Sequence, residues 1–218
     1  MSKREHFFIP VMGVPWWGKN TIIAKLTNDH PHLFTQVLSD KTRNFRNNNG
    51  NPEKEWVDYY KKSMDDFKLW VWNNEYIEWN EYKDNNTNTI LGYYGTNRQL
   101  LLDTLQDHHV IKELDPNGYT QLIDQNIDFP YFGLYIDIQK DSVFRKRMIA
   151  RGTKNNTIIT SFDITNRVNL ASSEREIAYI LSQDPSNHFH LIDGDKTIEE
   201  VYSQFKTVIG NYIPLQTK

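Results

Sequence analysis

The chain of 218 residues contains no cysteine, which excludes disulfide bonds, thiolate metal sites and a cysteine nucleophile. The apolar run at residues 7–12 is too short to span a bilayer or to act as a signal peptide, so we expect no membrane partner and a cytoplasmic location. A formal net charge of −3 argues against an indiscriminate nucleic-acid binder. With 38% hydrophobic and 24% charged residues, the chain has enough apolar material for one packed domain.

The most informative stretch is residues 13–21, which read GVPWWGKNT. Its spacing is that of a phosphate-binding loop, G-x-x-x-x-G-K-[ST], with Asn20 in the last position. Residues 7–12 indicate a buried strand before the loop, and residues 21–26 begin an amphipathic helix after it. In such a loop, backbone N–H groups, a helix N-terminus and a lysine surround the phosphates. The alternative is a strand-turn-helix corner with a chance Gly-Lys pair.

Two features set this loop apart from the usual pattern. Trp16 and Trp17 are bulky where a close backbone approach to phosphate favours small residues. Asn20 offers a neutral amide oxygen where a hydroxyl usually coordinates magnesium, and Thr21 follows one place later. Metal binding at the loop is therefore weakened.

Residues 39–46, SDKTRNFR, place Arg43 and Arg46 three positions apart beside hydroxyl groups. Two guanidinium groups that converge on one point suit a phosphate, although the same spacing also occurs on solvated surfaces. Further along, residues 53–60 and 75–82 alternate like strands, and residues 64–74 have helical spacing.

The order of these pieces resembles the guanylate kinase family, whose members transfer a phosphoryl group from ATP to GMP. Six family motifs are involved: S-x-T-T-R-x-x-R, G-x-D-Y, E-F-x-E-W, N-Y-Y-G-[ST], D-x-D-x-Q-G and R-x-x-x-R-G-T. They are similar to residues 39–46, 56–59, 75–79, 92–96, 113–118 and 147–153. The resemblance runs from about residue 6 to residue 209, and six motifs in this order are specific where one alone is not.

The resemblance implies a GMP pocket. The residues that would hold the GMP phosphate are Arg43, Arg46, Tyr59 and Tyr94. Those that would read the guanine base are Ser39, Glu78, Thr96 and Asp115. A carboxylate such as that of Glu78 can accept hydrogen bonds from the guanine N1–H and 2-amino group, which adenine cannot offer. A solvent-facing strand residue is the alternative interpretation of Glu78.

The resemblance also implies an ATP site and a set of catalytic cations. The implied ATP-binding residues are Gly13, Val14, Pro15, Trp16, Trp17, Gly18, Lys19, Asn20 and Thr21. The implied catalytic residues are Lys19, Arg43, Arg147, Arg151 and Arg167, the last three of which would reach the transferring group when a lid closes. Mg²⁺ would accompany ATP, with Asn20 and Glu113 as metal-site residues, partly through water.

We expect an α/β fold. Apolar strands at residues 7–12, 36–39, 110–115, 131–136 and 189–192 alternate with helical stretches, which indicates a parallel sheet covered on both faces. The resemblance implies a three-layer P-loop kinase fold over residues 1–218. Its core would comprise residues 1–38, 98–140 and 176–218, with an inserted α+β GMP-binding subdomain at 39–97 and a helical lid at 141–175.

Three functional hypotheses remain open. The first is a guanylate kinase that uses MgATP and GMP, and the acceptor-side residues favour it. The second is a catalytically impaired, guanylate kinase-like nucleotide-binding or protein-interaction module, which the altered loop favours. The third is a kinase for another monophosphate, given Asp40, Lys41 and Trp56 around the acceptor site, although Glu78 and Asp115 argue against it.

Overall fold

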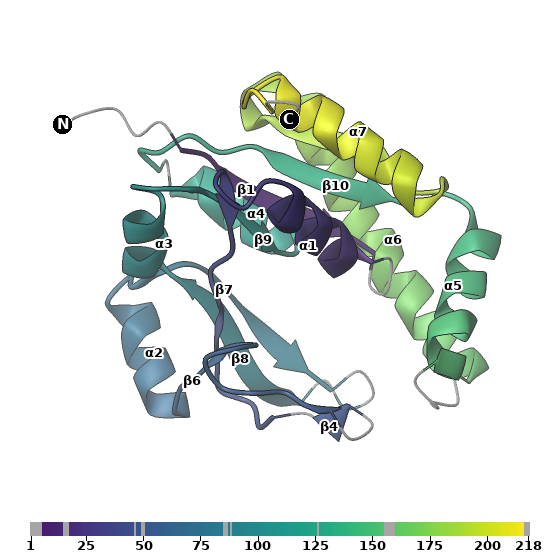
Figure 1. Ribbon diagram of the computed structural model, residues 1–218. Coiled ribbons are helices and arrows are strands. Elements are labelled where there is room, and N and C mark those ends of the chain that lie inside the picture. Colours follow the sequence, from purple (N-terminus) through teal and green to yellow (C-terminus); the bar gives the residue numbers. More distant parts are fainter. Residues whose placement is uncertain are drawn as a thin grey trace.

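A parallel sheet of five strands forms the centre of the computed structural model (Figure 1). The structure describes residues 6–14, 18–45, 47–48, 51–84, 87, 89–125, 127–154 and 160–215. In spatial order the strands are β11 (Phe189–Asp193), β10 (Gly133–Asp137), β1 (Phe8–Gly13), β9 (His109–Glu113) and β2 (Phe34–Thr35). Each strand runs parallel to its neighbours, which confirms the expected parallel sheet.

Helices cover both faces of this sheet. Ile9 and Val11 on β1 belong to one apolar cluster with residues of α1 (Lys19–Asp29) and α7 (Ile198–Gly210). Successive side chains of a strand point to opposite faces, so Phe8 and Met12 belong to a second cluster on the other side. The helices on that side are α3 (Arg98–Thr104), α4 (Pro116–Asp124) and α6 (Ser161–Gln183). The expected three-layer α/β fold is confirmed.

A second sheet of four strands is built from residues 40–97 (Figure 1). Its strands, in spatial order, are β6 (Tyr60–Lys61), β3 (Asp40–Lys41), β8 (Ile90–Asn97) and β7 (Tyr76–Lys83). The helix α2 (Met64–Trp72) packs on it, because Phe67 stacks on Tyr76 with ring centroids 4.4 Å apart. The remaining two strands, β4 (Asn47–Asn48) and β5 (Asn51–Pro52), pair with each other.

Two helices follow β10. They are α5 (Asp141–Lys154) and α6, which extends without a break through positions 175 and 176. Phe144 and Met148 on α5 and Ile164 and Ala171 on α6 belong to the apolar cluster that includes α1 and α7. Both helices are therefore anchored to the same core. In the described part of the chain, we find no helix whose length and apolarity would let it cross a membrane.

Several local predictions are confirmed, with boundaries shifted by a few residues. The helices expected at residues 21–26 and 64–74 are α1 and α2, and the strand expected at residues 75–82 is β7. Strands expected at residues 7–12, 110–115, 131–136 and 189–192 are β1, β9, β10 and β11.

The strand predicted at residues 36–39 is wrong. Strands β2 and β3 end before and begin after this segment, so it passes from one sheet to the other. The backbone of this segment makes hydrogen bonds that are not part of the central sheet. The carbonyl of Val37, for example, accepts from the Lys112 ammonium at 2.9 Å. The carbonyl of Ser39 accepts from the backbone N–H of Tyr60 at 3.0 Å.

The strand predicted at residues 53–60 is also wrong except for its last residue. Residues 56–58 form a turn, in which Trp56 has a φ of 65° and the backbone N–H of Asp58 donates to the carbonyl of Lys54. Two apolar residues of this segment are exposed, Trp56 to 74% and Val57 to 65%, whereas Tyr59 is fully buried. Alternation alone did not distinguish a strand from a turn that exposes its apolar side chains.

Candidate functional site

The loop after β1 has the backbone that a tight strand-to-helix connection requires. Gly13 has a φ of 139°, and a Cβ atom at this position would lie 2.5 Å from the carbonyl oxygen of Ile136. Gly18 has a φ of 97° and forms the N-cap of α1, where its carbonyl accepts from the N–H groups of Thr21 and Ile22. Glycine alone adopts such conformations without strain. Pro15, Trp16 and Trp17 lie outside the described residues.

Lys19 is turned back onto this loop. Its ammonium donates to the carbonyl of Gly13 at 2.7 Å and to that of Val14 at 3.3 Å. It also lies 3.1 Å from Oε1 of Glu113, at the end of β9, and the residue is only 7% exposed. The lysine is therefore buried at the carboxyl ends of β1 and β9, and a phosphate would have to replace these contacts.

The magnesium implied by the family resemblance has a modest donor set here. Among the described residues, no group of three histidine, aspartate or glutamate side chains is placed to hold a metal ion. Mg²⁺ bound with a nucleotide takes several ligands from phosphates and water and needs only one or two carboxylates. Glu113 is half exposed and offers one carboxylate next to Lys19, while Asn20 is exposed at the start of α1. These residues fit an ion that arrives with the phosphates.

A row of polar side chains lies at one end of the second sheet. Glu78 on β7 lies opposite Thr96 on β8. Asp40, the first residue of β3, pairs with Gly95 on β8, so Ser39, which precedes Asp40, lies toward Thr96. The Thr96 hydroxyl donates to Oε1 of Glu78. Glu78 is only 1% exposed, and its Oε2 has no hydrogen-bond partner in the described part of the chain. The row thus presents a buried carboxylate oxygen with unused accepting capacity.

Lys112 lies next to this row, and the sequence analysis missed it. Its ammonium donates to Oγ of Ser39 at 2.9 Å, and the residue is 5% exposed. Burial raises the pKa of Glu78, and the charge of Lys112 acts against that rise. Burial lowers the pKa of Lys112, and Glu78 acts against that change. A charged residue in the apolar sequence of residues 109–112 was the signal that could have revealed it.

Asp115 links the two sheets at the start of α4. It caps this helix by accepting from the N–H of Gly118 at 2.7 Å. It also accepts from the hydroxyl of Tyr94 at 2.7 Å and from the amide of Asn80 at 3.2 Å. A Cβ atom on Gly118 would lie 3.2 Å from Oε2 of Glu78, so Asp115, Tyr94 and Glu78 are brought to one place. The sequence had predicted all three as site residues.

Arg46 lies outside the described residues. The Arg43 guanidinium donates to both carboxylate oxygens of Glu53, at 2.6 and 2.7 Å. It also lies 5.1 Å from the ring centre of Tyr59, which is fully buried. The two implied phosphate-binding residues Arg43 and Tyr59 are therefore adjacent. Glu53, which the sequence analysis did not single out, occupies the guanidinium.

The implied lid arginines lie on α5 and α6. Arg147 donates to the carbonyl of Gly194 at 2.9 Å and to that of Lys196 at 2.8 Å, so it is docked on the connection after β11. The side chain of Arg151 lies outside the described part of α5. Arg167 on α6 is half-buried. The expectation that all three point at one ligand is not realised for Arg147 in this structure.

Glu174 on α6 shows how this helix approaches the loop. Burial raises the pKa of Glu174 to about 7. The charges of Lys19 and Arg167 oppose the rise, while those of Asp115 and Glu113 add to it. Glu174 thus lies within electrostatic reach of both the loop lysine and the helix-capping aspartate. The sequence analysis missed this residue because a glutamate in a long polar helix usually faces solvent.

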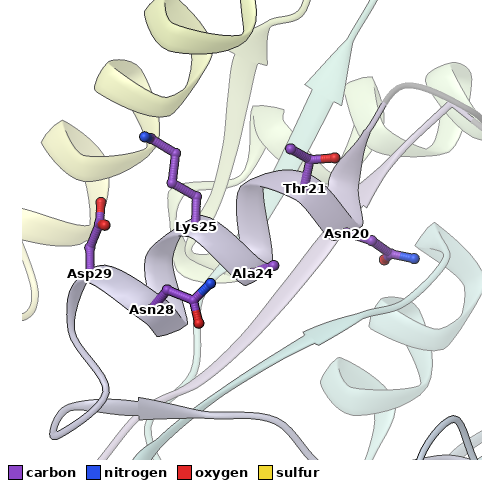
Figure 2. A pocket seen from close by; sticks show the side chains of 6 residues that line it. All are labelled: Asn20, Thr21, Ala24, Lys25, Asn28 and Asp29. Carbon is purple, nitrogen blue, oxygen red and sulfur yellow. The ribbon is translucent and has the colours of Figure 1, made fainter.

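A shallow hollow of about 560 Å³ lies along the outer side of α1 (Figure 2). It begins at Asn20 and Thr21 and continues past Lys25 to Asp29. Lys25 and Asp29 point toward α7, where Glu199 lies 3.7 Å from Lys25 and the Tyr202 hydroxyl donates to Asp29 at 2.6 Å. These contacts join two helices, and the hollow is separate from the polar row at Glu78.

Comparisons with known proteins agree with the arrangement just described. A family model for guanylate kinase matches residues 8–212 of the chain. The structure is also similar to the crystal structure of guanylate kinase from Anaplasma phagocytophilum, with a TM-score of 0.61 and 18% sequence identity. This match covers 96% of the present chain and 87% of the other. At that identity the structural likeness concerns the fold alone.

Proposed function

The chain belongs to the guanylate kinase family, and from this we propose that it transfers a phosphoryl group from MgATP to GMP, giving ADP and GDP. Family and fold support a nucleotide kinase function. That GMP is the acceptor is what we propose in addition. The observation that carries this step is the buried carboxylate of Glu78, whose Oε2 has no hydrogen-bond partner among the described residues.

The Glu78 carboxylate suits guanine. One oxygen accepts from Thr96, which leaves the other to accept from a base edge. Guanine offers two adjacent donors, N1–H and the 2-amino group, while adenine offers an acceptor at N1 and no 2-amino group. A buried acceptor that meets an acceptor is left unpaired, which costs free energy and gives selectivity. Asp115 and Ser39 border the same place and complete the proposed base pocket.

The acceptor phosphate would bind at Arg43, with Arg46, Tyr59 and Tyr94 as its further partners. A guanidinium can hold a phosphate through paired hydrogen bonds, as it now holds Glu53. The Tyr94 hydroxyl is now hydrogen-bonded to Asp115, within the same sheet as the proposed base pocket. Phosphate binding therefore has to exchange the Arg43–Glu53 ion pair for an Arg43–phosphate pair.

The donor phosphates would bind at residues 13–21, where Gly13 and Gly18 shape the backbone and α1 begins at Lys19. Phosphoryl transfer depends on alignment of two phosphates and cancellation of their charge. Lys19 would supply one cation from the loop, and Arg147, Arg151 and Arg167 would supply others from α5 and α6. Bound magnesium would shield the phosphate oxygens, with Glu113 and Asn20 as its nearest protein groups.

We also propose that a monophosphate-binding subdomain and a lid close over the bound nucleotides. We assign residues 39–97 to a monophosphate-binding subdomain and residues 141–175 to a lid. Residues 1–38, 98–140 and 176–218 would form the core. Kinases of this kind gain from closure because water, a competing acceptor, is excluded from the transferring group. Arg147 would have to leave the carbonyls of Gly194 and Lys196 to take part.

A second candidate is a catalytically impaired guanylate kinase-like module that binds a nucleotide or a protein partner. The contacts of Lys19 favour it, because two loop carbonyls and Glu113 already satisfy the ammonium. Trp16, Trp17 and Asn20 in the loop point the same way. Both candidates keep the base pocket, so they differ in turnover.

The deciding experiment measures ADP formation by the purified protein with MgATP and, in turn, GMP, AMP, UMP and dTMP. We expect turnover with GMP, and its loss in Lys19→Ala. Lys25→Ala is the matched control, because Lys25 lies on the same helix and contacts Glu199 on α7 instead of the loop. Binding of GMP without turnover would favour the impaired module. Absence of GMP binding would overturn the kinase and the nucleotide-binding form of the second candidate, and would leave a module that binds a protein partner.

A further inference from the structure

Lys112 occupies an unusual place for a lysine. It lies on β9, a strand of the central sheet whose preceding residues Val110 and Ile111 are fully buried, and its ammonium reaches the segment that joins the two sheets. An ionised lysine inside a protein costs free energy unless it is paired and hydrogen-bonded. Here the ammonium donates to Val37 O and to Ser39 Oγ, both at 2.9 Å. The burial and these bonds connect Lys112 to the polar row at Glu78.

The bond between Lys112 and Ser39 has a fixed direction. An ammonium group has three donors and no acceptor, whereas a hydroxyl has one donor and two acceptor lone pairs. Ser39 must therefore accept from Lys112, and its own hydrogen points elsewhere. Without Lys112, the hydroxyl would be free to act as donor or acceptor toward a ligand.

The neighbours of Ser39 indicate to which group of a bound base its hydroxyl would donate. The register of the second sheet pairs Asp40 with Gly95 and Thr96 with Glu78, so Ser39, which precedes Asp40, lies on the Thr96 side of the row. If Glu78 accepts from N1–H and the 2-amino group of guanine, the remaining group on that edge of the base is the 6-oxo oxygen, an acceptor. The 6-oxo oxygen therefore needs a hydrogen-bond donor close to Glu78. The Thr96 hydroxyl already donates to Glu78, which leaves the Ser39 hydroxyl.

We infer that Lys112 is a positioning residue of the base pocket, which keeps the Ser39 hydroxyl as a donor toward the 6-oxo group of the bound base. The inference rests on the proposed function, since it needs a 6-oxopurine in this pocket. Lys112 thereby adds a second polarity requirement to that of Glu78. A base must then present donors to the carboxylate and an acceptor to the serine.

Four charged side chains act on the Lys112 ammonium. Glu78 on β7, Asp40 on β3 and Glu113 on β9 attract it, and Lys41 on β3 repels it. Asp40 is itself buried and accepts from the Tyr76 hydroxyl at 2.9 Å. Burial lowers the pKa of Lys112, and the three carboxylates, together with the acceptors Val37 O and Ser39 Oγ, oppose that change.

The test compares binding of GMP with that of 6-thio-GMP, measured by calorimetry. The thio analogue keeps N1–H and the 2-amino group but carries a much weaker acceptor at position 6. The wild-type protein should prefer GMP. In Lys112→Met and in Ser39→Ala this preference should fall at least about threefold, the size expected for one neutral hydrogen bond. The double variant should be no worse than Ser39→Ala, because Lys112 acts through Ser39.

Two further variants serve as a control and as a conservative replacement of Lys112. Lys83→Met is the matched control, because its ammonium lies 2.7 Å from Glu81 at the end of β7 and is not in contact with the polar row, so the preference should stay at the wild-type value. Lys112→Gln keeps a donor for Ser39, so it should retain more of the preference than Lys112→Met and serves if the methionine variant fails to fold.

Equal weakening of both ligands by Lys112→Met would overturn the inference, as would a further fall of the preference when Lys112→Met is added to Ser39→Ala. If the wild-type protein binds and phosphorylates GMP but the variants keep its preference, only this inference fails. If the wild-type protein binds neither nucleotide, the proposed function fails with it.

Discussion

Arg43 and Glu53 form a two-pronged ion pair, with guanidinium-to-carboxylate distances of 2.6 and 2.7 Å. The two side chains are only 12% and 15% exposed. A carboxylate and a phosphate present similar pairs of oxygen atoms to a guanidinium. In the proposed pocket, Glu53 therefore competes with the phosphate of GMP for Arg43.

This competition predicts that Glu53→Gln binds GMP about threefold to tenfold more tightly than the wild-type protein, because the neutral amide releases Arg43. Calorimetric titration with GMP measures the change. Glu55→Gln is the matched control, since Glu55 is exposed and accepts from the backbone N–H of Lys61 at 3.2 Å, away from Arg43. Weaker binding by Glu53→Gln would show that Glu53 instead positions Arg43 for the phosphate.

The sequence predicted the parts of the fold that depend on local pattern. The strand β1 was visible because Ile9 and Val11 alternate with Phe8 and Met12, and burial on both faces makes such a strand apolar throughout. Glu78, Asp115 and Thr96, which the structure brings close together, were predicted because each lies in a motif whose order along the chain was informative.

The remainder depends on contacts between distant residues. Lys112 meets Ser39 across 73 positions, and no local pattern encodes such a pairing. Arg43 and Glu53 are joined by a fold of the intervening loop, and Glu174 approaches Lys19 only because α6 packs over the carboxyl ends of the strands. Tertiary packing decided these partners, so a sequence read in short windows could not show them.

Replacement of Glu78 tests the selectivity argument directly. In Glu78→Gln, the amide would present a donor where the carboxylate accepts, so one of the two bonds to guanine is lost inside a buried site. We expect kcat/KM for GMP to fall about 100-fold or more. Steady-state kinetics with GMP at a fixed MgATP concentration measure it.

Glu81→Gln is the control for Glu78→Gln, because Glu81 lies on the same strand and contacts Lys83 at 2.7 Å instead of the polar row. An undiminished kcat/KM for GMP in Glu78→Gln would remove the main support for the proposed acceptor.

Because Glu174 is buried, we expect the free energy of unfolding to depend on pH. Burial raises its folded pKa from 4.5 to about 7, so the folded state binds its proton more tightly than the unfolded state does. The resulting stabilisation is fully present below about pH 4.5 and is lost as the pH rises through about 7. Glutamine does not titrate, so the stability of the wild-type protein relative to Glu174→Gln should decrease across this interval and then level off.

Urea unfolding of both proteins at a series of pH values measures the difference. Glu176→Gln, two positions along α6 and exposed, is the control and should not change the pH dependence. A difference between the wild-type protein and Glu174→Gln that stays constant with pH would contradict the burial of the carboxyl group.

Gly13 is the position where the loop backbone is most constrained. Its φ of 139° is costly for any other residue, and a Cβ atom would lie 2.5 Å from the backbone oxygen of Ile136. Gly13→Ala should therefore lower the free energy of unfolding by at least about 2 kcal/mol. Gly210→Ala should be neutral or stabilise by up to about 1 kcal/mol, because nothing lies within 4 Å of its Cβ position and the residue ends a helix. Urea unfolding of the two variants compares them, and equal stabilities would mean that the loop adopts another backbone than the one described.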